Sequence, residues 1–120
     1  LSMEKLNPVL AWYEADDVAT GFNLSRQVAE LGGWGHTAVV YSDDPDTVAQ
    51  FGQLPVGRLL VNTPAIMGGM GFSTDLEPSF MLGTGTASGS IVSDNVTAMH
   101  LINIKRIAYE SRPWRDIYDL

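Results

Sequence analysis

The sequence predicts an α/β protein with a parallel β-α-β-α-β core, followed by a glycine-rich arm and a terminal strand. In residues 1–64, short apolar runs alternate with segments whose apolar residues recur at helical spacing. The apolar runs are continuously hydrophobic, which is typical of strands buried on both faces of a parallel sheet. Beyond residue 64 the glycine content rises, and the last apolar run alternates with polar side chains.

The first strand is expected at residues 8–13, and it ends in an acidic turn of the kind that caps a helix. The first helix is expected at 18–31, because its apolar residues lie mainly three and four positions apart and two glycines follow it. The run from 37 to 41 is rich in β-branched residues and predicts the second strand.

A short second helix is expected from Pro45 to Phe51, with Asp43 or Asp44 as its N-cap. Aspartate favours the N-cap position, and proline is well tolerated in the first turn. The third strand is expected at 57–62. Parallel strands of this kind are joined by right-handed crossovers, and the loops at their carboxyl ends are the expected ligand side.

Two glycine-rich connections, 65–71 and 82–90, are expected to be irregular. Long irregular segments in a compact domain commonly form a site or contact another part of the molecule. The run 101–109 alternates and predicts a half-exposed strand, which pairs either with another chain or with the edge of this same fold. We therefore expect two parts, an α/β part at 1–64 and an arm with a terminal strand and tail at 65–120.

The composition excludes several classes of protein. With 45% hydrophobic and 18% charged residues, and no apolar run near the about 20 residues of a membrane helix, no membrane span is expected. The net charge is −7, which argues against nucleic acid as a partner. The N-terminus has no signal-peptide pattern, so the cytoplasm is expected. The chain has no cysteine, which excludes disulfides, thiolate metal sites and a thiol nucleophile within these 120 residues.

Two glycine-rich or acidic motifs do not match known ligand loops. In residues 83–89 the third glycine comes one position too late for a G-x-G-x-x-G fingerprint. The acidic group at 43–46 lacks the spacing of a calcium loop and is interpreted as a solvated helix cap, so no metal site is expected. His36 lies where a helix passes into a strand, and the pattern alone leaves open whether it binds a ligand or only hydrogen-bonds within the fold.

Five blocks occur together in one order, and this series resembles the C-terminal part of the catalytic domain of the CoA-acylating aldehyde dehydrogenases, including the aldehyde half of the bifunctional aldehyde-alcohol dehydrogenases. The resemblance extends over residues 3–108, and five blocks in register are more specific than any one of them. The blocks are 4–10, 32–37, 57–64, 78–86, and 94–96 together with 101–106.

The resemblance implies an aldehyde dehydrogenase fold and an NAD-dependent reaction, in which a short-chain aldehyde and coenzyme A give acyl-CoA and NADH reversibly. In that family a cysteine thiolate attacks the aldehyde, hydride passes to the nicotinamide, and coenzyme A accepts the acyl group. The resemblance places this cysteine in a segment preceding residue 1. The 120 residues alone are therefore expected to be inactive. The alternative is a free-standing, non-catalytic α/β assembly or regulatory module.

The resemblance also implies roles for individual residues. Glu4 matches a glutamate that accepts hydrogen bonds from the nicotinamide ribose, and Leu6 stands where an apolar wall near the nicotinamide is expected. Gly83 matches a glycine that approaches the cofactor. His36 matches a histidine that either assists deprotonation of the CoA thiol or has a structural role. The run 101–109 resembles the terminal strand through which the family forms homo-oligomers.

Overall fold

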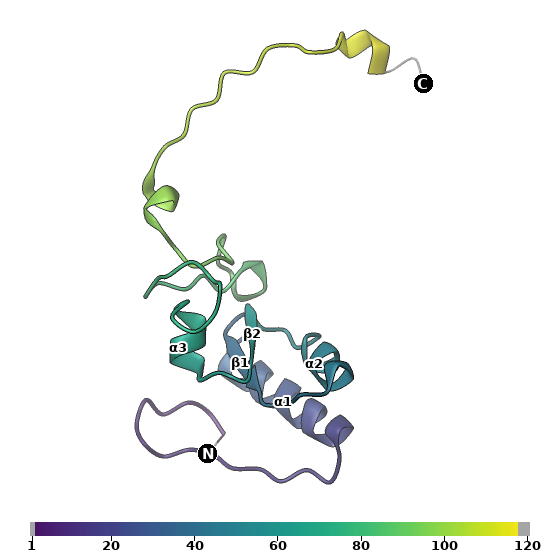
Figure 1. Cartoon of the computed structure of the whole chain (residues 1–120), viewed down its shortest axis with the longest axis vertical. Helices are drawn as coiled ribbons and strands as arrows, with labels where there is room; N and C mark the ends of the chain where they lie inside the picture. Colours follow the sequence, from purple (N-terminus) through teal and green to yellow (C-terminus); the bar gives the residue numbers. More distant parts are fainter. Residues whose placement is uncertain (1, 118–120) are drawn as a thin grey trace.

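The computed structural model describes residues 2–117 and shows a small α/β body from which the C-terminal segment extends (Figure 1). A pair of strands lies at the centre of this body, between helices on either side. The elements in chain order are α1 (Val18–Gly32), β1 (Thr37–Val40), α2 (Pro45–Phe51), β2 (Arg58–Val61) and α3 (Ala65–Gly69), followed by the 3₁₀ turns η1 (Thr86–Ser88), η2 (Ala98–Leu101) and η3 (Trp114–Ile117).

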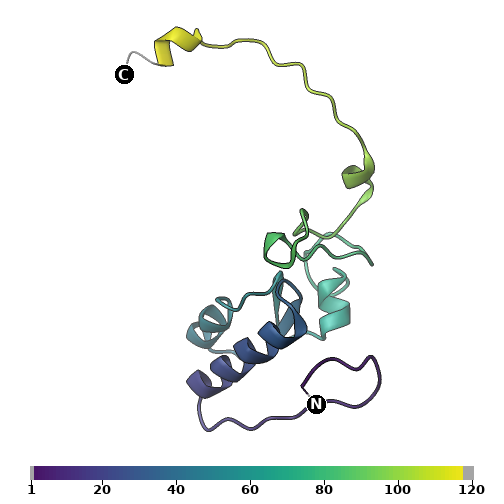
Figure 2. The ribbon, with the colours of Figure 1, turned by 180° about the vertical axis from the view of Figure 1, so that it is seen from behind.

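The two strands form the parallel pair that the sequence predicts. β1 and β2 lie side by side with Thr37 opposite Arg58 and Val40 opposite Val61, and α2 is the crossover between them. α2 and α3 lie on opposite sides of the strands when the molecule is seen from the front and from behind (Figures 1 and 2). The rings of Phe22 and Phe51 meet edge to face at 5.7 Å and join α1 to α2.

Both predicted helices are confirmed, and their ends follow from local chemistry. The Thr20 amide donates to the Asp17 carboxylate at 2.7 Å, which makes Asp17 the N-cap of α1. The helix ends at Gly32, and its C-cap is Gly33, whose φ of 98° lies in the left-handed region that favours glycine. Of the two predicted caps of α2, Asp44 is the one that the structure shows.

The predicted strand at 8–13 is wrong, because this segment has no strand partner among the described residues. It belongs to an N-terminal arm, residues 2–15, that folds back on itself through a hydrogen bond between the Ser2 and Tyr13 hydroxyls. Leu10 is 88% exposed and Trp12 is 85% exposed. Apolar character alone does not make a strand, since a strand exists only where a neighbour satisfies its backbone N–H and C=O groups.

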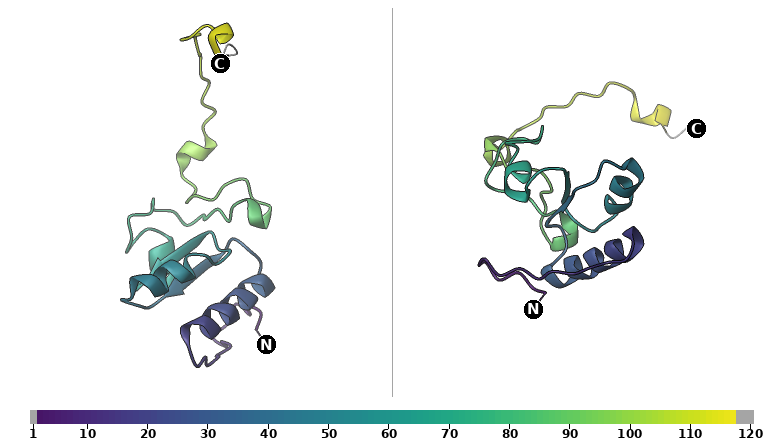
Figure 3. Two further views of the ribbon diagram at one scale, coloured as in Figure 1. Left: turned by 90° about the vertical axis from the view of Figure 1, so that its right-hand side faces the viewer. Right: turned by 60° about the horizontal axis from the view of Figure 1, so that its bottom comes forward.

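The predicted strand at 101–109 is likewise not formed in this chain. The 3₁₀ turn η2 ends at Leu101, and residues 103–110 run on without strand pairing among the described residues. The side views show this segment projecting away from the body (Figure 3). The extension explains a Cα radius of gyration of 19.5 Å, against about 14 Å for a compact chain of this length. A half-exposed strand forms only where a neighbouring edge pairs with it, and residues 101–109 pair with neither outer edge of the two-stranded sheet.

Helix α3 lies in a segment that the sequence analysis expects to be irregular. It packs against both strands, and the absence of a side chain at Gly68 permits this packing, because a Cβ there would lie 3.0 Å from Leu60 Cδ1. The apolar core of the described residues is small and consists of Val40, Leu54 and Leu60. Leu60 at 3% exposure is the most buried of the three, so α3 covers the best-packed position of the sheet.

We predict that the Asp44 cap makes α2 sensitive to acid. Hydrogen bonds from the Thr47 hydroxyl and then from the Thr47 amide lower the pKa of Asp44 below its ordinary value. The pKa of Asp44 is thus lower in the folded chain than in the unfolded chain, where it is about 3.9. The ionised cap therefore stabilises the helix fully at pH values above the unfolded pKa, and this stabilisation is lost as the pH falls through the folded pKa. Since α2 has only 7 residues, it depends on its cap.

Hydrogen exchange of the Thr47 and Val48 amides measures this effect. Their protection is expected to fall below pH 4 in the wild type. In Asp44→Asn it is expected to be partly reduced at neutral pH but insensitive to acid, because the amide oxygen still accepts hydrogen bonds and does not titrate. The same acid-induced loss in both proteins would contradict the assignment of Asp44 as the titrating cap.

Candidate functional site

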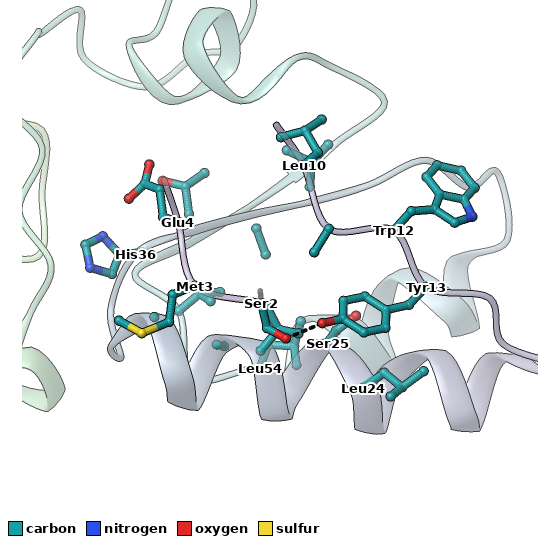
Figure 4. Close-up of a pocket in the computed structure, with 18 of the residues that line it drawn as sticks. Ser2, Met3, Glu4, Leu10, Trp12, Tyr13, Leu24, Ser25, His36 and Leu54 are labelled. Atoms are coloured by element: carbon teal, nitrogen blue, oxygen red, sulfur yellow. Dashed lines mark hydrogen bonds between the residues drawn. The ribbon is translucent and has the colours of Figure 1, made fainter. Parts of the chain in front are cut away.

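The candidate site is an open cavity of about 880 Å³ between the N-terminal arm, helix α1 and strand β1. Three of the four residues singled out by the sequence analysis, Glu4, Leu6 and His36, line it. In the close-up, Glu4 and His36 lie at the same end of the cavity, away from Trp12 and Tyr13 (Figure 4). The fold thus brings together two residues that are 32 positions apart in the chain.

The N-terminal arm presents Glu4 without engaging its side chain. No hydrogen bond or ion pair involves the Glu4 carboxylate within residues 2–117, and the residue is exposed. The turn that follows is shaped by Leu6, whose φ is 47°, and by a hydrogen bond from the Val9 amide to Asn7 Oδ1 at 3.0 Å. Leu6 is 89% exposed, so it lines the cavity as an unpacked apolar side chain.

His36 is fixed through its backbone, and its ring stands free. The Gly35 amide donates to the Pro55 carbonyl at 2.9 Å, and the Gly57 amide donates to the His36 carbonyl at 2.8 Å. Within residues 2–117 the imidazole makes no hydrogen bond, and its Nε2 lies 3.6 Å from the position that a Cβ on Gly33 would take. An exposed imidazole on a well-anchored backbone can accept or donate a proton.

Gly83 lies outside the cavity lining but packs beside the turn that carries His36. The Gly83 amide donates to the Asp94 carbonyl at 2.9 Å, and the Gly85 amide donates to the Val92 carbonyl at 2.9 Å, so residues 83–94 form a closed loop, which we name the glycine loop. A Cβ on Gly35, whose φ is 87°, would overlap the Thr84 carbonyl. The glycine loop and the His36 turn are therefore in direct backbone contact.

The buried Gly83 has no room for a side chain within this fold. A Cβ there would lie 2.9 Å from the Asp94 carbonyl oxygen and 2.6 Å from the Val92 carbonyl carbon. The need for glycine at this position thus has a cause within the chain itself. This packing is distinct from the approach to a cofactor that the sequence resemblance implies for Gly83.

The candidate residues gather at the amino ends of the strands. His36 directly precedes β1, and Gly57 directly precedes β2. The sequence analysis expects the ligand side at the carboxyl ends, as is usual for parallel sheets. At the carboxyl ends of the strands, the side chain of Asn62 binds the backbone of Ser42. Its Oδ1 accepts from the Ser42 amide at 2.9 Å, and its Nδ2 donates to the Ser42 carbonyl at 3.1 Å.

The sequence analysis missed two polar residues, Arg58 and Asn95, that hydrogen-bond to the segments next to the site. Asn95 is 6% exposed, and its Nδ2 donates to the carbonyls of Gly69 at 2.9 Å and Glu77 at 2.6 Å. Arg58 is half-buried and donates to Thr37 and to the glycine loop. A charged residue at the head of an apolar strand was the available signal for Arg58, whereas the role of Asn95 depends on carbonyls brought close only by folding.

The part of the chain that the structure describes offers neither a metal site nor a membrane span. Within residues 2–117, no three histidine, cysteine, aspartate or glutamate side chains are grouped so that they could hold a metal ion. None of the helices in this range combines the length and apolar character needed to cross a membrane.

Comparisons with known proteins show that most of this chain matches a small part of several larger enzymes. No family model matches it. It is 41% identical over 111 residues to the bifunctional aldehyde-alcohol dehydrogenase of Escherichia coli K12, which covers 88% of this chain and 12% of that protein. It is 36% identical over 110 residues to the acetylating succinate-semialdehyde dehydrogenase of Clostridium kluyveri, covering 91% of this chain and 24% of that protein.

Solved structures give the same picture. The chain superimposes on a probable aldehyde dehydrogenase from Listeria monocytogenes with a TM-score of 0.87 and 42% identity, covering 97% of this chain and 26% of that one. For an acetylating aldehyde dehydrogenase from Geobacillus thermoglucosidasius the TM-score is 0.86 and the identity 38%, covering 93% of this chain and 25% of that one. The described α/β arrangement is thus that of a segment of these larger folds.

Proposed function

We propose that this chain, which belongs as a segment to the CoA-acylating aldehyde dehydrogenase family, supplies cofactor-binding and acyl-transfer residues to an enzyme that converts an aldehyde, CoA and NAD to acyl-CoA and NADH. The cavity shared by Glu4, Leu6 and His36 is the observation that supports the proposal. We further propose a division into residues 1–64, as the last part of the catalytic domain, and 65–120, as the arm and terminal strand.

The side chains of Glu4 and Leu6 in the cavity suit the nicotinamide half of NAD. The Glu4 carboxylate offers two adjacent acceptor oxygens, which suit the two neighbouring hydroxyls of a ribose, and no described residue engages them. Leu6 provides apolar surface on the same wall. The proposed role of Gly83 is to keep the glycine loop free of a side chain where it comes near the cofactor. NAD, when bound, accepts the hydride that leaves the substrate.

His36 is proposed as the base that takes the proton from the CoA thiol. Imidazole accepts protons near neutral pH, and the ring of His36 makes no internal hydrogen bond within residues 2–117 that would compete. Since the 120 residues contain no cysteine, the sulfur nucleophile of the family reaction comes from another part of the enzyme. The chain on its own is therefore predicted to be inactive.

Assembly and location are part of the same proposal. Leu101, Ile107 and Tyr109 are 85%, 77% and 87% exposed, and their segment is extended without a partner strand among the described residues. Pairing of residues 101–109 with a second subunit would cover these side chains and satisfy the exposed backbone. We propose a homo-oligomer on this basis, and a cytoplasmic location for the enzyme.

The proposed function is tested by an assay of the full-length protein that contains this chain. With short aldehydes and NAD, sustained NADH formation is expected only when CoA is present, with acyl-CoA as the product detected by mass spectrometry. The 120-residue chain is expected to give neither product. No CoA-dependent NADH formation with any short aldehyde would refute the proposal and favour a non-catalytic module.

Replacing the ribose acceptor is expected to weaken NAD binding selectively. In the full-length protein, Glu4→Gln should raise the KM for NAD about tenfold, since a hydrogen bond to a charged group is worth about 1.5–3 kcal/mol. The KM for CoA should change less than the KM for NAD. Glu14→Gln is the matched control, because Glu14 lies in the same arm but does not line the cavity. Equal effects of the two substitutions would contradict the role of Glu4.

A further inference from the structure

Arg58 connects three separate segments through a single guanidinium group. Its Nη1 donates to Thr37 Oγ1 at 3.2 Å, and its Nη2 donates to the carbonyls of Gly83 at 2.7 Å and Ser93 at 3.3 Å. Thr37 is the first residue of β1, whereas Gly83 and Ser93 lie near the two ends of the glycine loop. A planar group with five donors in a fixed fork is suited to holding several oxygens at once.

Within residues 2–117, the charge of Arg58 has no acidic partner. Arg58 lines a groove together with Asp75, Glu77 and Asp94, but it forms an ion pair with none of them. The ion pair that does form in this part of the chain joins Arg26 to Glu30. Burial lowers the pKa of Arg58 from its ordinary value. Placing a cation in a half-buried site is unfavourable unless its donors are used, and the donors of Arg58 are used on a neutral hydroxyl and on backbone carbonyls.

The Gly83 carbonyl, which accepts a hydrogen bond from Arg58, lies at the contact between the glycine loop and the turn that carries His36. A Cβ on Gly57 would lie 3.6 Å from the Gly83 carbonyl oxygen and would overlap the Gly35 carbonyl. Gly35 in turn lies against the Thr84 carbonyl, and the Gly57 amide donates to the His36 carbonyl. A shift of Gly83 therefore moves the backbone on which His36 stands.

We propose that Arg58 is a positioning residue, whose guanidinium anchors the glycine loop and thereby sets the place of the His36 imidazole in the cavity. This inference rests on the proposed function for its kinetic consequence, although the anchoring itself does not. Arg58 does not line the cavity, so it acts through the contacts of the glycine loop and not on the substrate directly. Its removal should therefore impair the step that uses His36 more than the steps that do not use it.

Kinetics of the full-length protein test the proposal. Arg58→Ala is expected to lower kcat for acyl-CoA formation about tenfold, because small displacements of a catalytic group slow its step. Arg58→Lys, which keeps the charge but not the fork, should lose less activity, and added methylguanidinium should restore Arg58→Ala in part. Arg26→Ala is the matched control, since this arginine lies on α1 and pairs with Glu30 on its exposed face.

A double-substitution experiment separates positioning from general destabilisation. In the His36→Asn background, Arg58→Ala is expected to change kcat by less than about twofold, because the two substitutions affect the same step. Losses that multiply in the double variant, or an Arg58→Ala enzyme that behaves like Arg26→Ala, would overturn the proposal.

Hydrogen exchange tests the anchoring independently of activity. In Arg58→Ala the Gly83 and Gly85 amides should exchange faster, while the Asn62 amide, which donates to the Val40 carbonyl at 2.9 Å, should keep its protection. Unchanged exchange at Gly83 and Gly85 would overturn the anchoring. If the wild type forms no NADH with CoA, the proposed function fails, whereas this measurement still decides whether Arg58 holds the glycine loop.

Discussion

His36→Asn is expected to lower kcat for acyl-CoA formation by the full-length enzyme about a hundredfold or more, the usual contribution of a positioned general base. Asparagine preserves polarity but does not accept a proton from a thiol. The backbone hydrogen bonds that fix residue 36 involve only its main chain, so the substitution should leave the turn in place. The slow step should be acyl transfer to CoA, and a first turnover of NADH in the absence of CoA should proceed at the wild-type rate.

The pH dependence of the same variant gives a second measure of the role of His36. The limb of the kcat profile that reports the general base should be present in the wild type and absent in His36→Asn. His100→Asn is the matched control, because His100 lies outside the cavity and its Nδ1 accepts a hydrogen bond from the Thr97 amide at 2.9 Å. Similar kcat values and pH profiles for the two variants would mean that His36 is a structural histidine.

Asn95→Leu is expected to destabilise the protein by about 2–4 kcal/mol. The side chain of Asn95 is buried, and its Nδ2 satisfies the carbonyls of Gly69 and Glu77. Leucine has the same branched shape but no donor, so both carbonyls would lose their partner, and an unsatisfied buried polar group costs about 1–3 kcal/mol. With a total stability of about 5–15 kcal/mol for a typical domain, this loss is large.

Urea denaturation measures the change in the free energy of unfolding for Asn95→Leu. In hydrogen exchange of the same variant, the Val96 amide, which donates to the Met81 carbonyl at 2.8 Å, should lose its protection first. Val96 belongs to the segment that Asn95 joins to α3. Asn23→Leu is the control, since residue 23 is exposed on α1 and does not line the cavity. A midpoint for Asn95→Leu that matches the one for Asn23→Leu would contradict the account of Asn95.

The elements that could be predicted from the sequence are those defined by local chemistry. α1 and α2 have their caps and apolar spacing within their own residues, and the pairing of β1 with β2 follows from the helix between them. The runs 8–13 and 101–109 have strand-like composition, but a strand is defined by its partner. Helix α3 was missed because its two glycines weaken the local signal, whereas its packing on Leu60 is a tertiary contact.

The site shows the same division. Glu4, Leu6 and His36 were identified through motifs, and the fold places all three around one cavity. Arg58 and Asn95 act on carbonyl groups of Gly69, Glu77, Gly83 and Ser93, and any residue carries a carbonyl. No pattern of side chains could therefore have indicated which carbonyls these two residues would meet.

The most direct test of the central claim is hydrogen exchange of the full-length protein with and without NAD, since the claim is that Glu4 and the His36 turn line one cavity that takes the nicotinamide half of NAD. Protection by NAD is expected in residues 2–7 and 33–37 together, while helix α2 at Pro45–Phe51 should exchange as before. NAD binding that is detected by calorimetry, but that leaves both segments unprotected, would contradict the account.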